Sequence, residues 1–188
     1  MSNQENIIRP NLMEEHAIKL LNDRGVTFDD IIDIVLEHQS EYIDDLDRDY
    51  IHSVLEKVLK KREVQNAVIT GIEIDIAAEK GYFSPLLNDL LMRDEGLYGI
   101  DEILVLSICN VYGTIGLTNF GYLDKTKPGI IGQLNDHKNQ HCNTFIDDIV
   151  GALAAATMSK IAHEHPLVTD VTINPSPSRS YTRHQSNK

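Results

Sequence analysis

The chain has 188 residues, of which 41% are hydrophobic and 24% are charged, and its formal net charge at pH 7 is −12. This composition is that of a globular chain long enough for one domain with a substantial core, and it excludes a disordered protein. The acidic balance also argues against nucleic acid as a partner, because phosphate groups repel a negatively charged surface.

Apolar residues recur at helical spacing, whereas strand-like alternation is almost absent. In chain order, this spacing predicts helices from Met13 to Arg24, from Thr27 through His38, from Leu46 to Val58, from Val64 to Gly81, from Ser84 to Leu91, from Asp101 to about Tyr112, from Pro128 onward, and from Thr144 to about His165. We therefore expect an all-α fold, a single-domain bundle over residues 1–165 with a central buried helix. Residues 166–188, rich in Pro, Ser and Thr, are expected to form a disordered tail.

Residues 103–123 carry no charged side chain and are numerous enough to cross a bilayer. A helix that stops near Gly113 is too short to do so, and we expect a buried helix followed by a glycine-rich loop over residues 112–129. The N-terminal residues lack the basic and apolar regions of a signal peptide. Cys109 and Cys142 do not indicate a disulfide scaffold, so a cytoplasmic location is expected.

The stretch NTFIDDIVGALAAAT, residues 143–157, places two adjacent acids at the start of an almost wholly apolar helix. Asp147 has a structural interpretation, because it stands at capping-box spacing from Thr144 and an acid in the first turn suits the helix dipole. Asp148 is harder to explain, since it heads a stripe of small residues that indicates close packing, and burying an ionised carboxylate costs several kcal/mol. Either the helix start is open to water or a cation neutralises the pair, and we favour the cation.

A third acid, Asp75, lies on the same helical face as Val64, Val68 and Ile72, where an acid is out of place. A role as a further ligand for a hard cation such as Mg²⁺, which prefers oxygen atoms, would explain it. A hydrogen-bonded contact to a neighbouring helix end explains it equally well.

The glycine-rich loop has the features of a modest phosphate-binding element. Gly113 and Gly116 allow backbone N–H groups to approach an anion, Thr114 adds a hydroxyl group, and Lys125 and Lys127 add positive charge. A helix C-cap followed by a connecting loop explains the same residues at least as well.

These two elements together resemble a known family. Gly113-Thr114-Ile115-Gly116, followed by Asp147-Asp148-Ile149-Val150-Gly151, resembles the phosphatidylglycerophosphatase A family. The segments KREVQNAVITGIEIDIAAEKG, DEGLYGIDEIL, NVYGTIGLTNFGYLDK and NTFIDDIVGALAAA resemble its soluble bacterial branch, the low-temperature-requirement C proteins, and the resemblance covers roughly residues 12–165. It implies an all-helical, magnesium-dependent phosphomonoesterase that converts phosphatidylglycerophosphate into phosphatidylglycerol.

For such an enzyme, we expect Asp147 and Asp148 to hold Mg²⁺, with Asp75 as a candidate third ligand. Catalysis is assigned to the acid pair together with Thr114 and Lys125. The phosphate oxygens would be held by residues of the glycine-rich loop: Gly113, Thr114, Gly116 and Lys125.

Two other functions remain compatible with the sequence. One is a phosphatase of a soluble phosphate ester, and the other is a non-catalytic helical protein that binds metal or a partner. Basic tail residues (Arg179, Arg183 and Lys188) would support peripheral contact with an anionic membrane, and a homo-oligomer stays open. A cysteine phosphatase is excluded, because neither cysteine is followed six residues later by Arg.

Overall fold

The computed structural model describes residues 10–40, 42–44, 46–136 and 141–164. These residues form helices joined by turns, and no strand occurs among them, which confirms the all-α prediction. The helices are α1 (Pro10–Asp23), α2 (Phe28–Gln39), α3 (Arg48–Leu59), α4 (Arg62–Glu79), α5 (Pro85–Met92), α6 (Ile100–Asn110), α7 (Gly113–Thr126), α8 (Ile130–Leu134) and α9 (Ile146–Glu164). The predicted tail over residues 166–188 lies outside the described residues.

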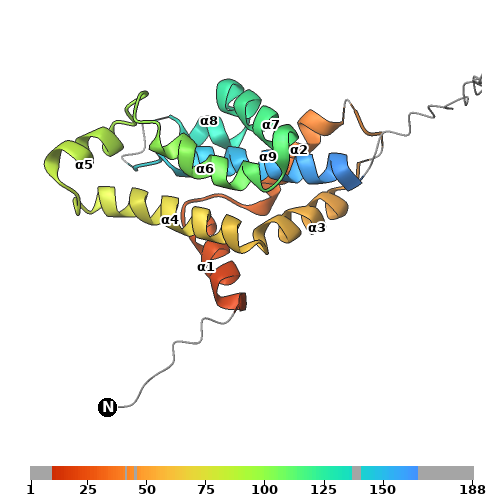
Figure 1. Ribbon diagram of the computed structural model, residues 1–188, viewed down its shortest axis with the longest axis horizontal. Helices are drawn as coiled ribbons and strands as arrows, with labels where there is room; N and C mark the ends of the chain where they lie inside the picture. Colours follow the sequence, from red (N-terminus) through yellow and green to blue (C-terminus); the bar gives the residue numbers. More distant parts are fainter. Residues whose placement is uncertain (1–9, 41, 45, 137–140, 165–188) are drawn as a thin grey trace, which may run out of the picture.

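Helix α9 runs through the middle of the molecule, with α3 and α4 along one side and α6, α7 and α8 along the other (Figure 1). Helix α2 also contacts α9, and α1 packs on α4. Every residue of α9 from Ile146 to Ser159 is buried. The predicted central helix is therefore present, and its first turn lies in the interior of the bundle.

Small side chains allow α9 to be contacted from several sides at once. They include one glycine and four alanines: Gly151, Ala152, Ala154, Ala155 and Ala156. The facing helix α4 contributes Gly71, where a Cβ atom would lie 2.6 Å from Ile149 Cδ1 and 3.1 Å from Phe145 Cβ. The close approach of α4 to the start of α9 thus depends on glycine at position 71.

The stretch predicted as a glycine-rich loop is a helix, so that prediction is wrong. Gly113, with a φ of +73°, lies at the turn where the chain leaves α6 and enters α7. Gly116, Phe120 and Leu123 follow at helical spacing and are buried. A Cβ atom on Gly116 would lie 2.9 Å from the carbonyl oxygen of Cys109, so this glycine permits close packing of α7 on the end of α6.

The same turn divides the uncharged stretch 103–123 between α6 and α7. None of the described helices combines the length and the apolar character needed to cross a bilayer. The prediction that residues 103–123 do not form one spanning helix is therefore confirmed.

We expect Gly71→Ala to lower the free energy of unfolding by about 1–2 kcal/mol, because overpacking between α4 and α9 outweighs the gain in helix propensity. Gly121→Ala on α7 is the matched control, since nothing lies within 4 Å of a Cβ atom there. The control should gain about 0.5–1 kcal/mol. Urea titration measures both values, and a Gly71→Ala protein as stable as Gly121→Ala would contradict the packing argument.

Candidate active site

Asp147 and Asp148 form the first turn of α9, and both are buried, with exposed fractions of 3% and 5%. The alternative in which this helix start is open to water is therefore excluded. An ionised carboxylate in such a position needs a compensating positive charge or must take up a proton.

The compensating charge comes from Lys127, the residue that directly follows α7. Its Nζ atom lies 3.0 Å from Asp147 Oδ2 and 3.5 Å from Asp148 Oδ1. The same atom lies 2.7 Å from Oδ1 of Asp124, one turn earlier on α7. One ammonium group is thus shared by three carboxylates.

The backbone around Lys127 holds this side chain in place. Lys127 has the left-handed conformation, with a φ of +45°, which costs energy for any residue other than glycine. Pro128 follows and prevents α7 from continuing. A Cβ atom on Gly132 would lie 2.6 Å from the carbonyl oxygen of Lys127, so α8 packs directly against this turn. The unusual conformation is therefore fixed by its neighbours.

Burial dominates the electrostatics of the pair. It raises the pKa of Asp147 to about 6, against the lowering effect of Lys127. Burial, together with the charge of Asp147, raises the pKa of Asp148 to about 8. The pKa of Lys127 lies well above its usual value, because the neighbouring carboxylates outweigh its own loss of hydration. The lysine is therefore firmly charged, while the pair is only partly compensated.

Further acids add to this negative charge. Beyond the effect of burial, Asp94 raises the pKa of Asp147, and both Asp124 and Asp101 raise the pKa of Asp148. Asp101, in the first turn of α6, is itself only 9% exposed. The electrostatic character of this region favours an additional cation.

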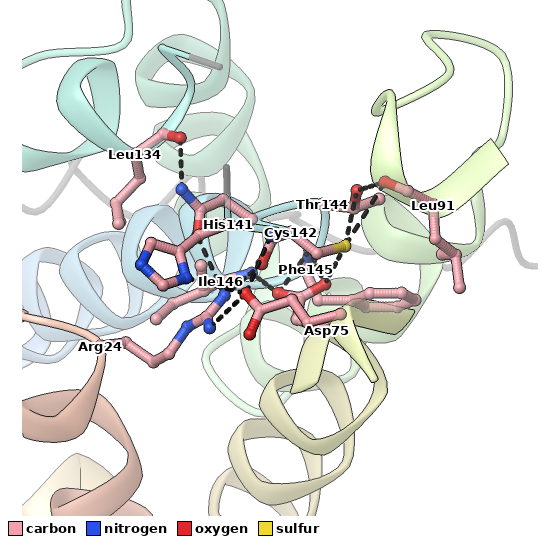
Figure 2. A network of polar contacts seen from close by, with 11 residues as sticks. Arg24, Asp75, Leu91, Leu134, His141, Cys142, Thr144, Phe145 and Ile146 are labelled. Carbon is pink, nitrogen blue, oxygen red and sulfur yellow. Dashed lines mark hydrogen bonds and ion pairs between the residues drawn. The ribbon is translucent and has the colours of Figure 1, made fainter. Parts of the chain in front are cut away.

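Asp75 of α4 holds the start of α9 from outside the helix. Its carboxylate accepts the backbone N–H groups of Phe145, at 3.2 Å, and Ile146, at 3.0 Å. Cys142 donates its thiol to the same carboxylate at 3.5 Å (Figure 2). The contact to a neighbouring helix end, which the sequence left open as one explanation of Asp75, is therefore observed.

The capping box predicted for Thr144 and Asp147 is wrong. The hydroxyl group of Thr144 instead donates to the carbonyl oxygen of Leu91 at 2.6 Å (Figure 2). Helix α9 begins two residues later, at Ile146. Asp75 supplies the acceptor that a local cap would otherwise provide.

A partly buried ion pair fixes the segment that leads into α9. Arg24, just after α1, lies 2.6 Å from Glu79 of α4. Arg24 also donates to the carbonyl oxygen of Cys142 and, at 3.1 Å, to Oδ1 of Asn143. Glu79 accepts the backbone N–H group of Cys142 at 2.9 Å. The approach to the acid pair is thus tied to α1 and α4 (Figure 2).

Most of the predicted phosphate-binding residues lie at the other end of α7. Thr114 and Lys127 are about 20 Å apart along the helix axis. At the far end, Ser159 donates its hydroxyl group to the carbonyl oxygen of Tyr112 at 2.8 Å, and Ser159 is about 16 Å along α9 from Asp148. The structure therefore does not bring three of the predicted residues to the acid pair: Gly113, Thr114 and Gly116.

The sequence interpretation selected Lys125, whereas the lysine that reaches the pair is Lys127. Lys125 is exposed. Asp124 was not selected either. One signal was available, because Asp124 and Lys127 stand three residues apart, the spacing of an ion pair on one helix face, immediately before Pro128.

The chemistry of these side chains suits a hard cation such as Mg²⁺. Within the described ranges, no group of three or more His, Cys, Asp or Glu side chains surrounds a common metal position. Mg²⁺ keeps several water molecules, however, and one or two carboxylates suffice to hold it. Asp147 and Asp148 meet that requirement. The oxygens of Asp75 are engaged by backbone N–H groups, so we do not assign Asp75 as a ligand.

Fold and site together define an all-helical protein whose central helix begins with a buried, lysine-paired couple of carboxylates. The sequence profile described as phosphatidylglycerophosphatase A matches residues 25–163. The Bacillus subtilis (strain 168) protein named "Uncharacterized protein YutG" is 50% identical over 151 residues, which cover 80% of this chain and 91% of that protein.

Solved structures agree with this relationship. The low temperature requirement C protein from Listeria monocytogenes is 52% identical, with a TM-score of 0.80 over 83% of this chain and 98% of that one. Protein ypjQ from Bacillus subtilis is 50% identical, with a TM-score of 0.80 over 84% of this chain and 97% of that one. The chain belongs to the phosphatidylglycerophosphatase A family, as the resemblance in its sequence indicated.

The buried carboxyl group of Asp75 should make the stability of the protein depend on pH. Burial raises the pKa of Asp75 to about 8, whereas an unfolded chain releases this proton near pH 4. Because the unfolded state ionises first, Asp75 lowers stability progressively from about pH 4 to pH 8, and no further above it. Wild-type protein should therefore lose stability relative to Asp75→Asn across this range. Denaturant titrations at several pH values measure the difference, and a constant difference would contradict the raised pKa.

Proposed function

We propose that the protein is a Mg²⁺-dependent phosphomonoester hydrolase that removes the terminal phosphate from phosphatidylglycerophosphate. The observation that carries this proposal is the buried Asp147–Asp148 pair, which shares the ammonium group of Lys127. Two buried carboxylates would hold a cation and, through it, phosphate. Membership of the phosphatidylglycerophosphatase A family supports the reaction and the lipid substrate.

Asp147 and Asp148 would hold the Mg²⁺ ion through their carboxylate oxygens. When bound, the ion supplies Lewis-acid stabilisation of the negative charge on the phosphate oxygens. Side chains of the protein would carry out proton transfer and hold the phosphate. A buried carboxylate oxygen that is not engaged with the ion would accept the proton of the attacking water as the water oxygen bonds to phosphorus. The phosphorus–oxygen bond to the glycerol then breaks, and the same carboxyl group would return the proton to the leaving alcohol oxygen.

Lys127 takes the role that the sequence interpretation gave to Lys125. Its ammonium group donates hydrogen bonds to phosphate oxygens and stabilises the charge that develops on them. Asp124, at 2.7 Å, orients this ammonium group. Gly113, Thr114 and Gly116 have no part in the proposal, because they lie at the opposite end of α7.

The same chemistry would also hydrolyse a soluble phosphate ester. A phospholipid would be taken from the membrane surface by peripheral contact. Phosphatidylglycerophosphate in detergent micelles and glycerol 3-phosphate in solution separate the two substrates. Turnover of the soluble ester alone would remove the lipid from the proposal.

Phosphate release that depends on Mg²⁺ should fall more than about 100-fold in Asp148→Asn, because loss of a metal ligand costs at least as much as loss of a residue that supports one. Burial raises the pKa of Asp148, so a neutral Asn should not destabilise the fold. Thermal unfolding of the variant checks that point.

Asp89→Asn is the control, because Asp89 is an exposed acid of α5 that pairs with Arg93 at 3.2 Å. It makes the same Asp-to-Asn change at an exposed position and should leave turnover unchanged. Normal turnover by Asp148→Asn, or equal turnover in the presence of a chelator, would contradict the proposed mechanism. Folded protein that hydrolyses neither substrate would indicate a non-catalytic role.

A further inference from the structure

The ammonium group of Lys127 contacts Asp147 Oδ2 and Asp148 Oδ1. These carboxylate oxygens are also the natural ligands for a divalent ion held by the pair. Lys127 and the ion therefore draw on the same acceptors. The proposed function, on which this inference rests, needs both cations at one small site.

The two cations compete for these oxygens, because both are attracted to the same buried negative charge. Mg²⁺ requires oxygen ligands at about 2.0–2.1 Å in near-octahedral geometry, and an ammonium group on the same oxygens takes up acceptor positions that the ion would use. The carboxylates are buried, so water screens the repulsion between the two positive charges only weakly. Binding of the ion therefore favours departure of the ammonium group from the pair.

The structure provides a place for the displaced group. The side chain of Lys127 is 25% exposed, and that of Asp124 is 33% exposed, whereas the Asp147 side chain is 4% exposed. Asp124 makes the shortest of the three contacts with Lys127 and lies on the solvent side of the cluster. The backbone of α8 at Gly132 lies close to the carbonyl oxygen of Lys127, so the movement we infer is one of the side chain.

We infer that Lys127 is a built-in competitor of the metal ion. It neutralises the carboxylate pair until the ion binds, and the ion then releases its ammonium group toward Asp124, where it meets the incoming phosphate. Metal binding and assembly of the phosphate site are thereby coupled. The ion binds first, and the phosphate follows.

Metal affinity gives the first test. Because the ammonium group competes with the ion for the carboxylates, its removal should tighten binding of Mg²⁺ or Mn²⁺ by about tenfold or more. Isothermal titration of Lys127→Met measures the dissociation constant in the absence of any substrate. Lys125→Met, which removes the same charge from an exposed side chain two residues away, should stay within about twofold of the wild type. Unchanged or weaker binding by Lys127→Met would overturn the inference.

Wild-type protein gives the second test, which does not depend on the folding of a variant. An amine-reactive reagent should modify Lys127 faster when Mg²⁺ is added, with Lys125 as the internal reference in the same peptide analysis. A fixed lysine that merely repels the ion would show no such increase, and that result would overturn the displacement step. Neither measurement involves turnover. An enzyme that releases no phosphate but passes both tests would contradict the proposed function and leave this inference standing.

Discussion

The rest of the structure depends on the burial of two adjacent carboxylates at the start of its central helix. Asp147 and Asp148 are surrounded by packed helices, and their desolvation opposes ionisation. A protein selected for stability alone would place neutral side chains there. The shared ammonium group of Lys127 offsets part of the cost, and the remainder is the kind of local destabilisation that binding sites retain.

Two separate supports hold this charge cluster in position. On one side, Asp75 accepts the N–H groups at the start of α9, and the Arg24–Glu79 ion pair fixes the segment before it. On the other side, the left-handed turn at Lys127 directs a long side chain from the end of α7 onto the first turn of α9. The site is therefore assembled from α4, α7 and α9, which meet only in the folded bundle.

This assembly explains which features could be predicted from the sequence. The helices with regular apolar spacing were predictable, and so was the anomaly of two acids ahead of an apolar run. Helix α7 was not predicted because a glycine-rich sequence is typical of a loop, although Gly116, Phe120 and Leu123 have helical spacing. Lys127 was predicted only as one of two positive charges, and the site was assigned to Lys125, because the partners of Lys127 on α9 lie about twenty residues away in the chain.

Anomalous scattering from crystals soaked in Mn²⁺ would show directly whether Asp147 and Asp148 hold a divalent ion, because it locates the ion independently of any reaction. We expect a peak within coordination distance of Asp147 and Asp148, with the ammonium group of Lys127 turned away toward Asp124. A soaked crystal with no peak at this pair, and with Lys127 still bridging the two carboxylates, would contradict this expectation.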